Sequence, residues 1–137
     1  MGTLYTKSEM RRLDGFQAKC LRHILGIQPP RLSRVSNHVV LEAAFCKPAS
    51  RLLLQKQLIL VGKVLREPRG QLNRVCFVND TLQTKTTSEY IRRVGRPRKE
   101  WVTSILPTAS KVAGSMEVLP TAVKNPLCWK RMVKSVA

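Results

Sequence analysis

The chain has 137 residues, with 25 lysines and arginines against 8 aspartates and glutamates, a formal net charge of +17. This length allows one small domain or one piece of a larger protein and excludes a multidomain enzyme, while 43% hydrophobic residues argue against a wholly disordered chain. The charge favours a polyanionic partner, nucleic acid or an anionic membrane surface, over an acidic protein.

A first amphipathic helix is predicted over residues 7–25. Thr6 and Glu9 have the spacing of a capping box, and Gly26 followed by Pro29 favours a helix end. On a helical projection the apolar residues share one face and most basic residues lie on the other. We expect the first set to face a core (Met10, Leu13, Phe16, Cys20, Leu21, Ile24, Ile27) and the second to face solvent (Arg11, Arg12, Lys19, Arg22, His23).

Two further helices are predicted over residues 37–45 and 48–66. Ser36 or Asn37 caps the shorter one, and Pro48 suits the first position of the longer one. The longer helix has a broad apolar side opposite Lys56, Lys63 and other polar residues, but two apolar residues, Leu52 and Ile59, stand on that polar side and suggest a further partner or segment over them. The sequence therefore predicts a mainly α fold with a bundle of three amphipathic helices in a domain spanning residues 7–67.

The rest of the chain is predicted to be a polar and basic linker, residues 68–100, followed by short C-terminal helices in residues 101–137. Residues 74–78 favour a short strand. Pro97 can open a helix that carries Trp101 and is ended by Pro107, and Asn125 with Pro126 begins the final helix.

The densest charge is the strip at residues 92–99, where five cations occupy eight positions: Arg92, Arg93, Arg96, Arg98 and Lys99. Three interpretations stay open. The strip contacts phosphates generally, or Gly95-Arg96-Pro97 acts as an AT-hook in a narrow minor groove, or the segment is a solvated linker. Val94 stands where an AT-hook has its first core arginine, so that match is incomplete.

Catalytic, cofactor and metal motifs are not found in the sequence. Asp14 and Asp80 are the only aspartates, and no paired carboxylates are placed to hold magnesium ions, so we expect no enzymatic turnover and no cofactor. The four cysteines lack C-x-x-C spacing, and the single pair Cys20 and His23 makes a weak case for metal.

Because the sequence shows neither a membrane-spanning run nor a secretory leader, we expect a nuclear or cytoplasmic protein that is not secreted. No apolar run approaches the roughly 20 residues that span a bilayer, and no secretory leader is recognised, so the cysteines are expected to be free thiols. Met1-Gly2 with Thr6 fits the N-myristoylation pattern, which leaves Gly2 as an alternative lipidation site on a basic peripheral membrane protein.

Nucleic-acid binding is the main functional hypothesis, because basic rows opposite apolar faces recur on the predicted helices. Cations of this kind neutralise phosphates and release counterions without reading sequence. The residues expected to contact phosphates are Arg11, Lys19, Arg22, Lys56, Lys63 and Arg66 on the helices, with Arg92, Arg93, Arg96, Arg98 and Lys99 in the strip.

Four short segments in the same order resemble the region downstream of the reverse transcriptase core in non-LTR (LINE-like) retrotransposon polyproteins. Residues 13–27 end in Arg22-His23-Ile24-Leu25-Gly26-Ile27, similar to that family's Arg-x-Ile-Leu-Gly-Ile. Residues 35–41 resemble its Ser-Asn-x-x-Val-Leu segment. Residues 57–66 resemble its Leu-Gly-His-Val-Leu-Arg segment, with Lys63 in place of His, and residues 95–101 resemble its Gly-Arg-Pro-x-x-x-Trp. The end at Trp129-Lys130-Arg131-Met132-Val133 is weakly similar to the family's Trp-rich end.

The resemblance implies a thumb or post-thumb region whose polymerase domain lies upstream in a parent polyprotein. Such a region would hold RNA or an RNA–DNA hybrid by its A-form shape and backbone charge. The alternative within this origin is a retroelement remnant without a working role.

Overall fold

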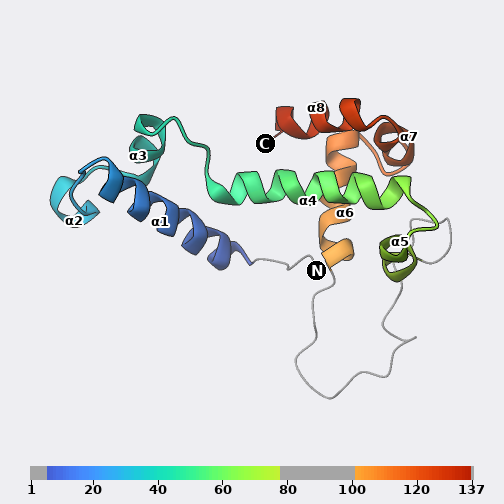
Figure 1. Ribbon diagram of the computed structural model, residues 1–137, viewed down its shortest axis with the longest axis horizontal. Coiled ribbons are helices and arrows are strands. Elements are labelled where there is room, and N and C mark those ends of the chain that lie inside the picture. Colours follow the sequence, from blue (N-terminus) through green and yellow to red (C-terminus); the bar gives the residue numbers. More distant parts are fainter. Residues whose placement is uncertain (1–5, 78–100, 137) are drawn as a thin grey trace, which may run out of the picture. The chain divides into compact units, whose positions relative to one another are not determined.

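The computed structural model describes residues 6–77 and 101–136, and these residues are mainly helical, which confirms the expected fold class (Figure 1). The chain divides into two compact units, an N-terminal unit at Tyr5–Leu54 and a C-terminal unit at Gln55–Ala137. This division falls inside the helix at Ala49–Arg66. The helices are α1 (Lys7–Ile24), α2 (Pro30–Ser33), α3 (Asn37–Ala43), α4 (Ala49–Arg66), α5 (Gln71–Cys76), α6 (Trp101–Ala113), α7 (Leu119–Lys124) and α8 (Pro126–Val136).

Helix α1 begins and ends where its sequence signals predict. Thr6 Oγ1 accepts from the Glu9 amide and the Glu9 carboxylate accepts from the Thr6 amide, which forms the capping box. At the other end Gly26 has a φ of 67°, and the Ile27 amide donates to the Arg22 carbonyl at 2.9 Å. This is a Schellman motif, and a residue with a Cβ would be strained at its left-handed position.

Helices α1 and α3 pack against each other, and the buried apolar residues of the N-terminal unit are Ala18 on α1 and Val40 and Leu41 on α3. Asp14 of α1 caps the start of α4, because its Oδ1 accepts from the Ser50 amide at 2.8 Å and its Oδ2 from the Ser50 hydroxyl at 2.7 Å. A carboxylate at a helix N-terminus is also favoured by the helix dipole.

The C-terminal unit is built around the indole of Trp129, which is fully buried. Its Nε1 donates to the carbonyl of Leu58 at 2.9 Å, so α8 is joined to α4. A Cβ added at Gly62 would lie 2.4 Å from two atoms of this indole. The absence of a side chain at residue 62 therefore allows the indole to approach the α4 backbone.

Two expectations for this unit are wrong. Residues 74–76 lie in α5 instead of a strand, because Gly70 starts a helix and Asn73 is buried with its Nδ2 donating to the Val64 carbonyl at 3.0 Å. Pro107 lies inside α6 and does not end it. On the helical projection Pro107 is opposite the buried stripe that includes Ile105 and Leu106, so packing of that stripe retains the helix while the proline ring faces solvent.

The remaining differences are small. Helix α3 ends at Ala43 instead of residue 45, and α4 begins at Ala49 with Pro48 just before it. The short helices α2 and α7 were not expected. The final helix begins as predicted, since Asn125 Oδ1 accepts from the amides of Leu127 and Cys128 at 3.0 and 3.2 Å.

Candidate nucleic-acid interface

The basic side of α1 is exposed, but the helix packs through a different face from the one expected. Arg11, Arg12 and Lys19 are exposed. The predicted inward residues Phe16 and Ile24 are also outside, at 67% and 76% exposure. The buried stripe is centred near Ala18, about 130° around the helix from the centre of the predicted apolar face, which is more than a third of a turn. Basic and apolar side chains are therefore presented together on the solvent side of α1.

Arg22 is the one helical cation of the predicted set that is buried, at 5% exposure. Its Nη1 donates to the Gln28 carbonyl at 3.2 Å and its Nη2 to Asn37 Oδ1 at 3.2 Å, with further bonds from these nitrogens to Ser33 Oγ and the Val35 carbonyl. The guanidinium thus ties the segment after α1 back to the helix. This position corrects the expectation for Arg22, because a buried guanidinium that is bonded to its own chain does not reach a phosphate.

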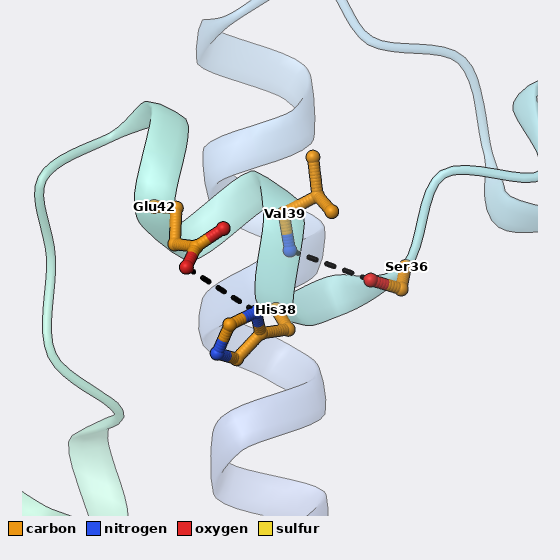
Figure 2. A network of polar contacts seen from close by, with 4 residues as sticks. All are labelled: Ser36, His38, Val39 and Glu42. Atoms are coloured by element: carbon orange, nitrogen blue, oxygen red, sulfur yellow. Dashed lines mark hydrogen bonds and ion pairs between the residues drawn. The ribbon is translucent and has the colours of Figure 1, made fainter.

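The acidic side chains of the N-terminal unit interact with groups other than the exposed lysines and arginines. They accept hydrogen bonds at helix N-termini or contact a histidine. Glu9 accepts from the Thr6 amide at 2.6 Å, and Asp14 caps α4. Glu42 pairs with His38, with 3.6 Å between Oε1 and Nδ1, on the helix that Ser36 caps through the Val39 amide (Figure 2). Among the described residues, no acidic side chain pairs with Arg11, Arg12 or Lys19.

The charge of the N-terminal unit is therefore poorly compensated. Its acidic residues are Glu9, Asp14 and Glu42. Its lysines and arginines are Lys7, Arg11, Arg12, Lys19, Arg22, Arg31, Arg34, Lys47 and Arg51. Apart from the buried Arg22, all of these cations are exposed. A surface of this kind has a positive potential that attracts anions.

In the C-terminal unit, Lys56 and Lys63 are exposed on one face of α4, seven residues apart and about 20° from each other around the helix. Arg66 is half-buried, and its Nη1 donates to the carbonyl of Val123 at 2.9 Å. One of its five N–H donors is thereby used within the fold. Lys63 and Arg66 also lie in the last turn of α4, where cations are favoured by the helix dipole.

Additional exposed cations lie on α8, where Lys130, Arg131 and Lys134 form a stripe opposite the buried residues Trp129 and Val133. Arg31 and Arg34, near α2, are also exposed. No sequence signal pointed to them, because their surroundings show no amphipathic period.

Several predicted positions lie outside the described residues. These are the strip residues Arg92, Arg93, Arg96, Arg98 and Lys99, and the alternative lipidation site Gly2. All four cysteines are free, and three of them, Cys20, Cys46 and Cys128, are exposed. In the part of the chain that the structure describes, no three His, Cys, Asp or Glu side chains gather as a metal site would require.

Comparisons with known proteins return no match, whether with protein-family models, curated proteins or solved structures. Within residues 6–77 and 101–136, no helix combines the length and apolar character needed to cross a bilayer.

Proposed function

We propose that the chain binds the sugar-phosphate backbone of nucleic acids through exposed cations on both of its units, and that it acts by binding and not by catalysis. In the N-terminal unit the proposed phosphate contacts are Arg11 and Lys19. In the C-terminal unit they are Lys56 and Lys63, with Arg66 beside them through the N–H donors that its bond to Val123 leaves unused. Arg22 has a structural role instead.

The observation that carries this proposal is the lack of acidic partners for exposed cations. Arg11 and Lys19 are exposed in a unit whose carboxylates are engaged elsewhere, and Lys56 and Lys63 are exposed without an ion pair among the described residues. Leaving so much charge uncompensated raises the free energy of the folded chain through self-repulsion. A polyanion removes this repulsion, and the release of its condensed counterions supplies the binding free energy.

The resemblance to retroelement proteins supports a more specific form of the proposal. We infer that the chain corresponds to a region that follows a reverse transcriptase core and would hold an A-form duplex, either RNA or an RNA–DNA hybrid, beside that polymerase domain. An A-form duplex is recognised through its backbone and 2′-hydroxyls, because side chains cannot read its deep, narrow major groove. Exposed lysines and arginines without a fixed partner suit such recognition.

Fluorescence anisotropy with three labelled ligands of equal length tests this proposal: an RNA duplex, an RNA–DNA hybrid and a DNA duplex. We expect tighter binding to the two A-form ligands and an affinity that falls steeply between roughly 50 and 200 mM salt. Equal, weak binding to all three would contradict the A-form preference. No binding at the lowest salt would contradict nucleic-acid binding altogether.

The basic strip is tested in the same assay by replacing Arg92, Arg93, Arg96 and Arg98 with Gln in the full chain. If the strip contacts phosphates generally, the salt dependence becomes shallower and all three ligands lose affinity about equally. Selective loss for an A·T-rich DNA duplex would instead indicate an AT-hook. Unchanged binding would remove the strip from the proposed interface.

A further inference from the structure

A groove of about 900 Å³ opens along the C-terminal half of α1, entirely within the N-terminal unit. One wall is the exposed side of α1, with Phe16, Lys19 and His23, and the other is the segment that returns from α1 past Pro29 to the start of α3. Its volume is within the range of small-ligand sites in proteins, which is about 300 to 1,000 Å³.

The two walls are held together by Arg22. This buried side chain bonds to Gln28 and Asn37, and both of those residues line the groove. The Schellman motif at Gly26 fixes the turn between the walls. The groove is therefore formed in the free chain, and a ligand that enters it does not have to order the walls first.

The groove combines an aromatic ring with the amine of Lys19 and the imidazole of His23. Phe16 is 67% exposed although it is a large apolar side chain. Lys19 follows it by three residues and His23 by seven, which places all three on the same side of α1 within two helical turns. Asn37 Oδ1 accepts from Arg22, so its amide group keeps an NH₂ donor at the groove wall.

We propose that this groove binds an unpaired base of a single-stranded nucleic acid, with the base stacked on Phe16 and the adjoining phosphates bound by Lys19 and His23. The inference rests on the proposed nucleic-acid binding and adds a class of substrate to it. Aromatic rings next to cations bind single strands in this way, because every base has a flat face and every nucleotide brings a negative charge. A blunt duplex offers the phosphates but keeps its internal bases stacked.

Charge excludes a second copy of the chain from the groove, since two N-terminal units with this excess of cations would repel each other. One further exposed cation, Arg12, lies on the same side of α1 beyond the groove, one turn before Phe16. Such a row suits a ligand with a negative charge at every unit, as in a phosphodiester chain, better than a peptide with occasional acidic residues.

The test compares two single-stranded probes that differ only in their bases: a labelled adenine 12-mer and an abasic phosphodiester chain of the same length. A blunt 12-base-pair RNA duplex is the third ligand. The full chain is measured with Phe16→Leu, which keeps an apolar side chain but removes the ring, and with Phe45→Leu as the matched control. Phe45 is 99% exposed and lies outside the groove.

We expect the unaltered chain to bind the adenine strand about five-fold or more tighter than the abasic strand, as one stacked base predicts. Phe16→Leu should bring this ratio close to one without changing duplex affinity, Phe45→Leu should leave the ratio intact, and Phe16→Trp should retain or increase it. A ratio of one for the unaltered chain, or a ratio unaffected by Phe16→Leu, would overturn the inference. Displacement of the strand by a Glu- and Leu-rich peptide at lower concentration than by unlabelled strand would overturn it in favour of a protein partner.

The duplex separates this inference from the proposed function. Salt-dependent duplex binding together with equal affinity for the base-bearing and abasic strands would refute the base site alone. Failure to bind any of the three ligands at low salt would refute both.

Discussion

Replacing Gly62 with alanine should destabilise the C-terminal unit, although alanine is the better helix former. The new methyl carbon would lie 2.4 Å from Cδ1 and Nε1 of the Trp129 indole. That indole is fully buried and donates its N–H to the Leu58 carbonyl, so it cannot move without losing this bond and its packing. Either α8 shifts away from α4 or the indole leaves its site.

The change in stability caused by Gly62→Ala is the difference between a gain in helix propensity and losses in hydrogen bonding and packing. Alanine gains about 1 kcal/mol over glycine in a helix interior. Against this stand about 1 kcal/mol for the indole hydrogen bond and about 1 to 3 kcal/mol for overpacking a well-filled core. The net expectation is a loss of about 1 to 3 kcal/mol in the free energy of unfolding of the C-terminal unit.

Gly15 provides the matched control, because it is also inside a long helix but a Cβ at this position would meet no atom within 4 Å. Gly15→Ala should therefore gain the propensity term alone and stabilise the N-terminal unit by about 0.5 to 1 kcal/mol. The same substitution is expected to have opposite signs at the two positions.

Urea unfolding measures both effects separately. The chain has two tryptophans, Trp101 and Trp129, and both belong to the C-terminal unit, so tryptophan fluorescence follows that unit while far-UV circular dichroism follows the helices of both. The expected result for Gly62→Ala is a lower urea midpoint by fluorescence. A midpoint equal to or above that of the unaltered chain would refute the placement of the Trp129 indole against Gly62.

Three further predictions concern other residues. Phe45→Gly should stabilise the N-terminal unit by about 1 kcal/mol, because Phe45 has a left-handed φ of 52° and almost no buried surface to lose. Arg22→Met should destabilise that unit by about 2 to 4 kcal/mol and accelerate amide exchange over residues 26–37, whereas Arg12→Met on the exposed side should change stability by less than about 0.5 kcal/mol. Burial raises the pKa of the Cys76 thiol, so alkylation followed by peptide mass mapping should find Cys76 the slowest of the four cysteines.

Each of these has a contradicting result. A lower midpoint for Phe45→Gly, equal exchange rates for the two arginine variants, or Cys76 alkylated as fast as the exposed cysteines would refute the corresponding statement. The raised pKa of Cys76 also determines how stability depends on pH. As the pH rises, the thiol stays protonated to a higher pH in the folded chain than in the unfolded chain. The contribution of Cys76 to stability is therefore fully present below about pH 8.5 and falls above it.

Helix ends could be predicted from the sequence because they depend on local chemistry. Thr6 with Glu9, Ser36 and Asn125 each cap a helix as their spacing indicates, and Gly26 ends α1 in the left-handed conformation that glycine favours. These interactions involve residues at most five apart in the sequence. Tertiary packing does not alter them.

The packed face of α1 could not be predicted in this way. A projection ranks faces by hydrophobicity and so placed Phe16 and Ile24 inside and Arg22 outside. The structure instead packs α1 against α3 and buries Ala18 on α1. It also buries Arg22, because hydrogen bonds from its Nη atoms to residues 28–37 offset the desolvation of the guanidinium. Those partners are set by the fold of the segment after α1, which no periodic pattern encodes.

The exposure of the candidate phosphate contacts could be predicted for most of them but not for all. Arg11, Lys19, Lys56 and Lys63 are exposed as expected, since lysine and arginine are rarely buried without a partner. Arg22 is the exception. The groove beside Phe16 was not predicted, because it depends on the rotation of α1 and on the path of the chain beyond Gly26.

The most direct test of backbone binding is the salt dependence of RNA-duplex affinity in two charge-matched variants of the full chain. One replaces Arg11, Lys19, Lys56 and Lys63 with Gln, and the other replaces Arg31, Arg34, Lys111 and Lys124, which are also exposed and are divided equally between the two units. Both lose four positive charges. If the first four residues contact phosphates, replacing them should reduce the slope of log affinity against log salt by about 3 to 4, at roughly 0.9 per contact. Replacing the second four should change the slope by less than about 1. Equal slopes for the two variants would contradict the assignment of these four residues and reduce the effect to net charge alone.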